Sequence, residues 1–536
     1  MVQHSKEEST SSLSSTLEAA ITGCLFLMAL FAPHSIAVTQ GAWLLGMLLW
    51  TIRLAVYPRP VLLRTPLDYV LLGFFILTGL SALFSYEPLV SIGKMRAASL
   101  FTIVYLVAEN VKTLRVARLL TFTLVASCMV NVFLTAGQLA IGKGVKVEGV
   151  RSDSPLKKAM FHSRTILKST PIVDGDTVWE VDGKAVNSPD DLAAELAGGS
   201  PVTAKVKIYR VEWMPVLEIP RGNLLAGNNA IDQLGIASWS KGRDWRATGF
   251  YGHWITYAEV LQLIASLALG LFLVSPRKLS VSGLLLFAAV TGLLFALGMT
   301  VTRASWAGLG ISAVVMLVMS VSRRTLLVVG ACAIPLVLGG LFVLRSRRSV
   351  GFIDTQDQST TWRETVWSEG THLFLSSPRH WVVGVGMDSL KAHWREWGLF
   401  DNGRIPMGHM HSNILQFALE RGAPALIVWL LLIGLYWRML WRVFRRIESD
   451  ANYHDGWIDQ GIILGALGGL TGFFVSGLVH YNWGDSEVVM VFYFIMSLAL
   501  IIERHHHRCA ISQVVPDAHN SSRPLPADSA RISGAY

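Results

Sequence analysis

The sequence is poor in charge and in cysteine. Charged residues make up only 15% of its 536 residues, whereas 52% are hydrophobic, a balance that a soluble domain of this size does not tolerate. The four cysteines lie in apolar runs or in the polar C-terminal tail, at Cys24, Cys128, Cys332 and Cys509. No exported loop therefore contains a cysteine pair, which argues against disulfides and against a cysteine-based zinc site. The composition indicates an integral membrane protein.

The first apolar run also lacks the marks of a cleaved signal peptide. Residues 1–16 are rich in Ser and Thr and contain acidic residues, so no basic segment leads into the run. No obvious small-residue cleavage site follows it either. We therefore interpret residues 1–16 as a disordered cytoplasmic tail and the run after them as the first membrane span.

Long apolar runs are what the sequence has in abundance. Because about 20 apolar residues form a helix that crosses a bilayer, we predict an all-α polytopic membrane protein with about 12 transmembrane helices. The predicted helices are 17–33, 37–55, 67–85, 97–110, 116–142, 254–275, 279–300, 305–322, 325–344, 414–438, 460–479 and 488–503. The first five fall within residues 17–142, the next four within residues 246–344 and the last three within residues 413–503.

Basic residues alternate from loop to loop. If the N-terminus is cytoplasmic, every inner loop and the tail at 504–536 are basic, as the positive-inside rule requires. This pattern accounts for the formal net charge of +9, so we do not expect nucleic acid as a partner. The short outer loops contain few basic residues, and the exceptions are Lys94, Arg96 and Arg303. Two long segments, 143–253 and 345–412, fall outside.

The first outer segment contains a small folded unit at residues 145–222. Its short alternating strands surround a helix, S-P-D-D-L-A-A-E-L, which Ser188 caps and Pro189 begins. This order, with G-D-T-V-W-E-V-D-G-K-A-V at 175–186, resembles a bacterial PDZ domain, a small α+β fold. Such domains bind peptide C-termini by strand addition. The resemblance implies a peptide or protein partner, but the residues leave a purely structural module equally open.

Polar residues at helical spacing follow His411 in H-S-N-I-L-Q-F-A-L-E-R-G, where the tenth predicted helix begins. Asn413, Gln416 and Glu420 share one face of that helix. One interpretation is that these groups satisfy one another between helices. The other is that the imidazole, at the aqueous boundary, is a general base that Glu420 orients.

Two arginines lie at the outer ends of predicted helices, Arg246 in W-R-A-T-G-F-Y-G-H-W and Arg303 in T-R-A-S-W-A-G. A guanidinium grips phosphate bidentately, and two guanidinia can divide a diphosphate between them. Taken alone, Arg246 can also be an interfacial residue that reaches lipid headgroups. Arg363, in T-T-W-R-E-T-V-W, is either a further phosphate or sugar contact or a solvated loop residue. Asp485 ends H-Y-N-W-G-D at the outer end of the eleventh helix.

These motifs, together with W-V-V-G-V-G before H-S-N-I-L-Q, resemble the O-antigen ligase superfamily, which includes O-antigen ligases, O-antigen polymerases and O-linked oligosaccharyltransferases. The resemblance implies an inverting glycosyltransferase that needs neither metal nor cofactor. It implies that a glycan is taken from undecaprenyl diphosphate at the periplasmic face of the bacterial inner membrane. Arg246 and Arg303 would bind the donor diphosphate and His411 would deprotonate the acceptor hydroxyl, with Arg363 and Asp485 as further matches.

The motifs do not specify the acceptor. The long helical outer segment at 345–412 favours an O-antigen ligase, whose acceptor is lipid A–core, while a polymerase and a protein O-oligosaccharyltransferase remain alternatives. Two hypotheses come from other classes. A secondary transporter has a similar number of spans, but we find no repeat relating the two halves. A PDZ-bearing membrane scaffold would leave Arg303 and the polar stripe after His411 unexplained.

Overall fold

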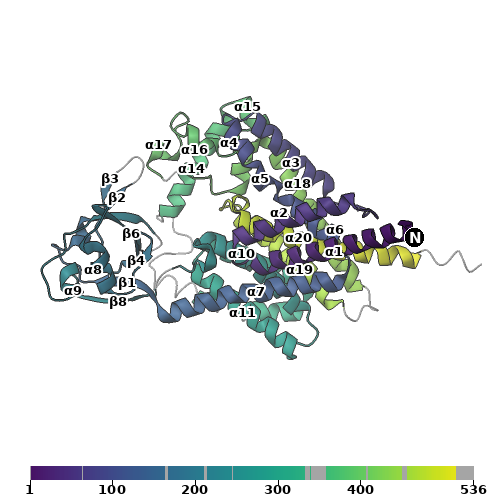
Figure 1. The fold of residues 1–536 in the computed structure, drawn as a ribbon, viewed down its shortest axis with the longest axis horizontal. Helices are drawn as coiled ribbons and strands as arrows, with labels where there is room; N and C mark the ends of the chain where they lie inside the picture. The colour runs from purple at the N-terminus through teal and green to yellow at the C-terminus, as the bar shows by residue number, and fades with distance from the viewer. Residues whose placement is uncertain are drawn as a thin grey trace, which may run out of the picture.

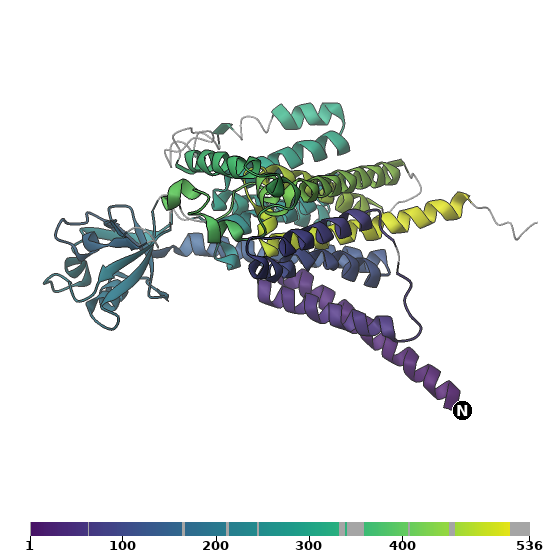
Figure 2. The same ribbon diagram turned by 90° about the horizontal axis from the view of Figure 1, so that it is seen from above.

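The computed structural model describes residues 2–331, 338–339, 358–449 and 456–514, apart from short gaps at 63, 163–166, 211–213, 244–245 and 406–407. It consists of a bundle of long helices with a small β-sheet unit standing at one end, which we call the sheet end (Figure 1). Figure 2 shows the same separation from above.

The long helices of the bundle are α1 (Val2–Phe31), α2 (Ile36–Ala55), α3 (Asp68–Leu83), α7 (Leu114–Ile141), α10 (Trp254–Val274), α11 (Val281–Thr300), α12 (Arg303–Ser320), α18 (Asn413–Ser449), α19 (Trp457–Ser476) and α20 (Ser486–Val514). One further crossing is built from short pieces, α4 (Pro88–Gly93), α5 (Met95–Ala98), the 3₁₀ turn η1 (Ser99–Phe101) and α6 (Thr102–Asn110). Within the described residues, 10 helices are long and apolar enough to cross a membrane, and α3 is a shorter apolar helix. The protein is therefore a multi-pass membrane protein, which confirms the predicted fold class.

The predicted spans differ from the helices mainly at their ends. The predicted helix at 97–110 corresponds to the segmented crossing, which begins earlier, at Pro88. Residues 323–331 are helical at the start of the predicted helix 325–344, and most of the rest of that span lies outside the described residues. Helix α1 begins at Val2 and so includes most of the predicted disordered tail at 1–16. The Ser/Thr/Glu-rich start contains neither Gly nor Pro, so nothing ends a helix that continues into the apolar run.

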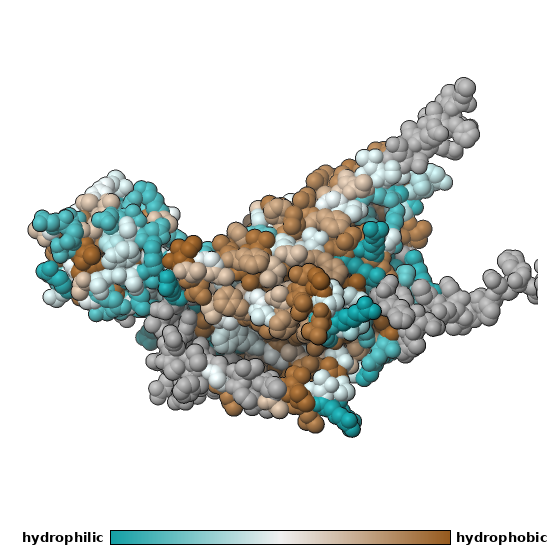
Figure 3. Space-filling view, turned by 90° about the horizontal axis from the view of Figure 1, so that it is seen from below, coloured by the Kyte–Doolittle hydropathy of each residue, from teal (hydrophilic) through white to brown (hydrophobic). Residues whose placement is uncertain are grey.

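The arrangement of the ends follows the predicted topology. The N-terminus and the far end of α20 both lie at the end of the bundle opposite the sheet (Figure 1). Both neighbours of the sheet in the chain, the end of α7 and the start of α10, lie at the sheet end. In Figure 3 the sheet unit is mostly hydrophilic, whereas hydrophobic residues cover much of the bundle. This contrast is expected where a helix bundle lies in lipid and the sheet unit in water.

The sheet unit contains eight strands, and every pairing is antiparallel. The strands are β1 (Lys143–Glu148), β2 (Met160–His162), β3 (Leu167–Ser169), β4 (Thr177–Val181), β5 (Lys184–Ala185), β6 (Thr203–Tyr209), β7 (Val216–Pro220) and β8 (Ser238–Gly242). Their order is β3-β2-β7-β6-β4-β1-β8, and β5 pairs with β4. Alternate residues of β6, Ala204, Val206 and Ile208, are fully buried, as expected for a sheet with one face on a core.

Helix α8 (Pro189–Ala197) packs on this sheet unit, with Ser188 and Asp191 forming a capping box at its start. The predicted unit ended at residue 222, but the sheet continues through α9 (Ala230–Leu234) to β8. Strand β8 pairs with β1, with Lys143 opposite Gly242. The two ends of the inserted unit therefore lie side by side.

Candidate active site

The loop that carries His411 is fixed by residues on both sides. His411 precedes α18 and has a φ of 48°, a left-handed conformation that non-glycine residues rarely adopt. Its backbone N–H donates to Nδ1 of His409, and the N–H of Met410 donates to Oε1 of Gln416. The ring of Trp362 lies 4.5 Å from the His411 ring. The surrounding structure thus holds the imidazole in place before any substrate binds.

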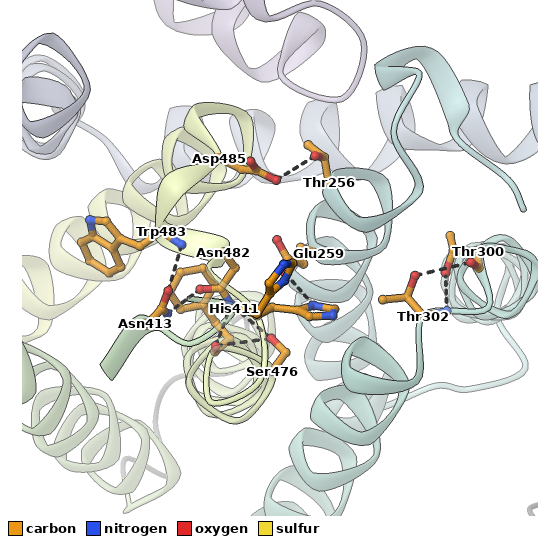
Figure 4. A network of polar contacts seen from close by, with 12 residues as sticks. Thr256, Glu259, Thr300, Thr302, His411, Asn413, Ser476, Asn482, Trp483 and Asp485 are labelled. Carbon is orange, nitrogen blue, oxygen red and sulfur yellow. Dashed lines mark hydrogen bonds and ion pairs between the residues drawn. The ribbon is translucent and has the colours of Figure 1, made fainter. Parts of the chain in front are cut away.

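Asn413 joins this loop to the linker between α19 and α20. Its backbone N–H donates to the carbonyl of Gly477, and its Nδ2 lies 2.6 Å from Oδ1 of Asn482. The N–H of Trp483 donates to Oδ1 of Asn413. Both groups of this amide are therefore used, and residues 477–483 are held against the start of α18, as Figure 4 shows.

Glu420 belongs to the same motif as His411 but binds a different segment of the chain. Helix α18 breaks at Gly422, which has a φ of 79°, so Glu420 belongs to a short first segment of the helix. The Oε1 of Glu420 accepts a hydrogen bond from the backbone N–H of Asp388, while its carbonyl accepts one from the N–H of Gly386. The structure therefore brings Asn413 and Gln416 to the His411 loop and Glu420 to the segment at 386–388.

Arg246 and Arg303 both lie near the turn between α11 and α12, at the sheet end. Arg246 donates from its guanidinium to the carbonyl of Val301 at 2.6 Å, and it stacks over the ring of Trp254. Arg303 begins α12 only two residues after Val301. The backbone of Ala247 also donates to the carbonyl of Met299, so the segment after β8 is tied to the turn between α11 and α12. This turn places both arginines in one neighbourhood.

The start of α10 contributes two side chains to the linker before α20. Thr256 donates to Asp485 at 2.7 Å, and one turn further Oε1 of Glu259 lies 3.0 Å from Nδ1 of His480. Figure 4 shows Glu259 beside His411, with Asn413 on one side and Thr302 on the other. Glu259 was not predicted from the sequence. A lone carboxylate within an apolar span was the available signal, but its partner lies 221 residues away.

Burial and neighbouring cations keep these imidazoles unprotonated. Burial holds the pKa of His411 well below its usual 6.5, and the charges of His409, Arg363 and His480 lower it further. Burial also lowers the pKa of His480 to about 3, with further contributions from Arg363, His409 and Arg246. Arg363 therefore opposes protonation of both imidazoles, and Arg246 opposes protonation of His480. A neutral imidazole there can accept a proton.

Asp485, another predicted site residue, lies just before α20. Burial raises the pKa of Asp485, while the hydrogen bond from Thr256 opposes this effect. Among the described residues, no group of three or more His, Cys, Asp and Glu is arranged to hold a metal ion.

The comparisons with known proteins locate a family domain within the bundle. A search of curated proteins found no match to the chain. Residues 287–430 match the family model described as O-antigen ligase, and this range contains Arg303, Arg363 and His411. The match supports the predicted superfamily: residues 287–430 form an O-antigen ligase domain, of a glycosyltransferase-like family, within a multi-pass membrane protein.

Proposed function

We propose that this protein moves a glycan from undecaprenyl diphosphate to an acceptor hydroxyl at the periplasmic face of the bacterial inner membrane. The observation that supports the proposal is a buried, fixed imidazole in the same family domain as Arg303 and Arg363, with Arg246 bound to the turn just before Arg303. Arg363 acts electrostatically on both His411 and His480, and Arg246 acts on His480. The chemistry of a diphosphate leaving group needs both kinds of residue.

The proposed roles follow from the charge that develops during transfer. His411 removes the proton from the acceptor hydroxyl as its oxygen attacks C1 of the donor sugar. The bond between C1 and the diphosphate oxygen breaks, and the electron pair leaves on the diphosphate. Arg246 and Arg303 bind this diphosphate, because guanidinium groups form paired hydrogen bonds to phosphate oxygens. Arg363 adds positive charge from α14 (Gln358–Leu375).

We propose lipid A–core as the acceptor, which makes the protein an O-antigen ligase. The support is the helical segment before His411, in which α14 is followed by α15 (Pro378–Val382), α16 (Ser389–His393) and α17 (Phe400–Gly403). A deletion strain separates the alternatives. Loss of long-chain lipopolysaccharide with accumulation of lipid-linked polymer is expected for a ligase. Capping with a single repeat unit would indicate a polymerase, and altered glycoproteins alone a protein O-oligosaccharyltransferase.

We also propose that the sheet unit is a PDZ-like module that docks a peptide or protein partner. Strand β8 lies at one edge of the sheet, where strand addition occurs. The Nζ of Lys241 in β8 donates to the carbonyl of Asn187, just before α8. The edge strand and the helix thus lie beside each other, as a groove between them requires.

The central prediction concerns His411. Changing His411→Ala should lower glycan transfer by about 100-fold or more, because general base catalysis contributes at least that much. Transfer would be measured with purified protein in lipid nanodiscs, using an undecaprenyl-diphosphate-linked glycan and lipid A–core. The control is His372→Ala, since His372 is an exposed histidine of α14. Transfer at the unchanged rate by His411→Ala, with normal protein levels, would remove His411 as the base.

A further inference from the structure

Glu259 and His480 form a buried pair whose chemistry the roles proposed above do not use. Their side chains are almost completely buried, and Oε1 of Glu259 lies 3.0 Å from Nδ1 of His480. Within the described part of the chain, Oε2 of Glu259 is buried and has no hydrogen-bond partner. A carboxylate buried within a membrane helix is costly, so it is expected to serve a function.

Other hydrogen bonds already hold the linker between α19 and α20 in place without this pair. Thr256 of the same helix binds Asp485 of the same linker, and Asn413 binds Asn482. These two hydrogen bonds, of which only the first involves an ionisable group, hold the linker to α10 and α18. The ionisable Glu259 is therefore not required to position the linker.

The pair is suited to hold a proton once negative charge from a bound donor offsets the cations that otherwise keep His480 unprotonated. When Glu259 is ionised, it accepts the Nδ1–H of His480, which leaves the lone pair of Nε2 to accept a proton. The resulting imidazolium would lie against a carboxylate. His411 has the rings of Trp362 and His409 as neighbours instead, and its Nδ1 has no hydrogen-bond partner among the described residues.

We propose that the Glu259–His480 pair is the proton sink of the transfer reaction. The inference rests on the proposed function, with His411 as the base. As the bond from the acceptor oxygen to C1 forms and the bond from C1 to the diphosphate breaks, the hydroxyl proton moves to His411 and then to His480. Glu259 is a positioning residue, which fixes the tautomer of His480 and stabilises its imidazolium.

The charges around His480 couple this step to donor binding. Arg363 of α14, Arg246 and His253 before α10, and His409 before α18 face it together with Glu259. The arginines by themselves oppose protonation of His480. A bound diphosphate brings negative charge that offsets them, so the sink accepts a proton only when the donor is in place.

The test is Glu259→Gln in the full chain, with the nanodisc transfer assay. Glutamine keeps an oxygen that accepts the Nδ1–H, so a structural role survives while the charge is lost. We expect kcat to fall by about 10- to 100-fold, with the donor KM within about twofold. The kcat should also rise with pH, because solvent base must then take the proton. His480→Gln should give the same loss, and the double variant should lose no more than either single variant. The control is Gln262→Met, the next buried polar residue of α10.

The outcomes separate this inference from the proposed function. If Glu259→Gln keeps the kcat and pH profile while His411→Ala lacks transfer, the proton sink is wrong and the transferase assignment stands. A lower kcat without any change in pH profile also overturns the sink, since a structural defect would explain it. If His411→Ala retains full transfer, His411 is not the base and the proton sink fails with it, whereas absence of transfer by the unaltered protein would overturn the proposed function. Should Glu259→Gln not accumulate in the membrane, His480→Gln is judged by the same criteria.

Discussion

The backbone of His411 is strained where the chemistry is proposed. A φ of 48° at a non-glycine residue costs free energy and persists only when neighbouring contacts hold it. Two such contacts lie next to it, from His409 to its own N–H and from Gln416 to the N–H of Met410. The Nε1–H of Trp367 also donates to the carbonyl of Met410. These bonds preorganise the imidazole, so binding of the acceptor need not order it.

The pH dependence of transfer follows from the lowered pKa of His411. A base must be unprotonated, and a base whose pKa is lowered in the folded protein stays unprotonated as the pH falls. We therefore expect kcat/KM for the donor to stay level from pH 8 down to about pH 5 rather than to fall near the usual histidine value. A bound diphosphate raises the pKa of His411, so kcat should fall at a higher pH than kcat/KM. Both constants would be measured over this range with saturating acceptor.

The residual rate of His411→Ala is the control for this profile. In this variant neither kcat nor kcat/KM should fall as the pH is lowered, since the imidazole that titrates is gone. A fall in the wild-type kcat/KM centred near pH 6.5 would contradict the prediction, because it would require an imidazole without the burial and the cationic neighbours of His411.

At the scale of elements, the end of the first segment of α18 is held by hydrogen bonds from the glycine-containing turn at residues 384–386. The break at Gly422 leaves the carbonyls of Leu419 and Glu420 without helical partners, and the N–H groups of Val385 and Gly386 bind them. Ser81 of α3 donates to the same carbonyl of Glu420. The segment W-V-V-G-V-G is thus the structural partner of E-R-G, which explains why both motifs accompany the His411 loop.

Gly386 is the most restrictive residue of this contact. Its φ is 96°, and an added Cβ would lie 1.8 Å from Oγ of Ser85. Gly386→Ala should therefore destabilise the folded protein by about 1–3 kcal/mol, the usual cost of overpacking, with additional backbone strain. Thermal unfolding in detergent, followed by tryptophan fluorescence, would measure the loss. Gly298→Ala in α11 is the matched control, because its Cβ would meet nothing within 4 Å and alanine favours a helix. Equal midpoints for the two variants would contradict this assignment.

The elements themselves were largely predictable because apolar length alone defines a span. The sequence also contained the signal for the break in α18, since R-G-A-P places Gly and Pro just inside the predicted helix at 414–438. The partners of the polar stripe were not predictable. Asn413 and Gln416 bind the His411 loop and its neighbouring linker, whereas Glu420 binds Asp388, because loop contacts far away in sequence decide the direction of each side chain.

At the scale of the whole molecule, one exception to the charge rule has a structural explanation. Lys94, in a loop predicted to be outside, forms an ion pair with Asp388 at 2.7 Å. Asp388 also donates its backbone N–H to Glu420. The basic residue thus helps to join the segmented crossing to the segment before α16. Sequence reasoning identified Lys94 as an exception but not its partner, which lies in a different part of the chain.

The sheet unit is inserted where the bundle can tolerate it. Its first and last strands pair with each other, and Lys143 lies opposite Gly242, so the chain leaves and re-enters the bundle at one place. Insertions with adjacent ends are compatible with an intact host domain. The unit also touches the bundle, since Trp179 and Tyr209 stack on each other and belong to the packed core of the helices. The insertion could therefore be removed without breaking the helix bundle, although in the folded protein it packs against the bundle.

Replacing residues 144–241 by a short Gly-Ser linker tests which of these properties matters for transfer. We expect the shortened protein to insert in the membrane and to keep transfer, reduced by up to about 100-fold, the cost of a small misplacement of the Arg246 segment. The nanodisc assay measures the rate, and His411→Ala in the shortened chain should abolish what remains. Complete loss of transfer by a correctly inserted, stable shortened protein would mean that the sheet unit supplies part of the reaction site. A docked unit that only recruits a partner cannot produce that result with purified components, because the assay contains no partner to recruit.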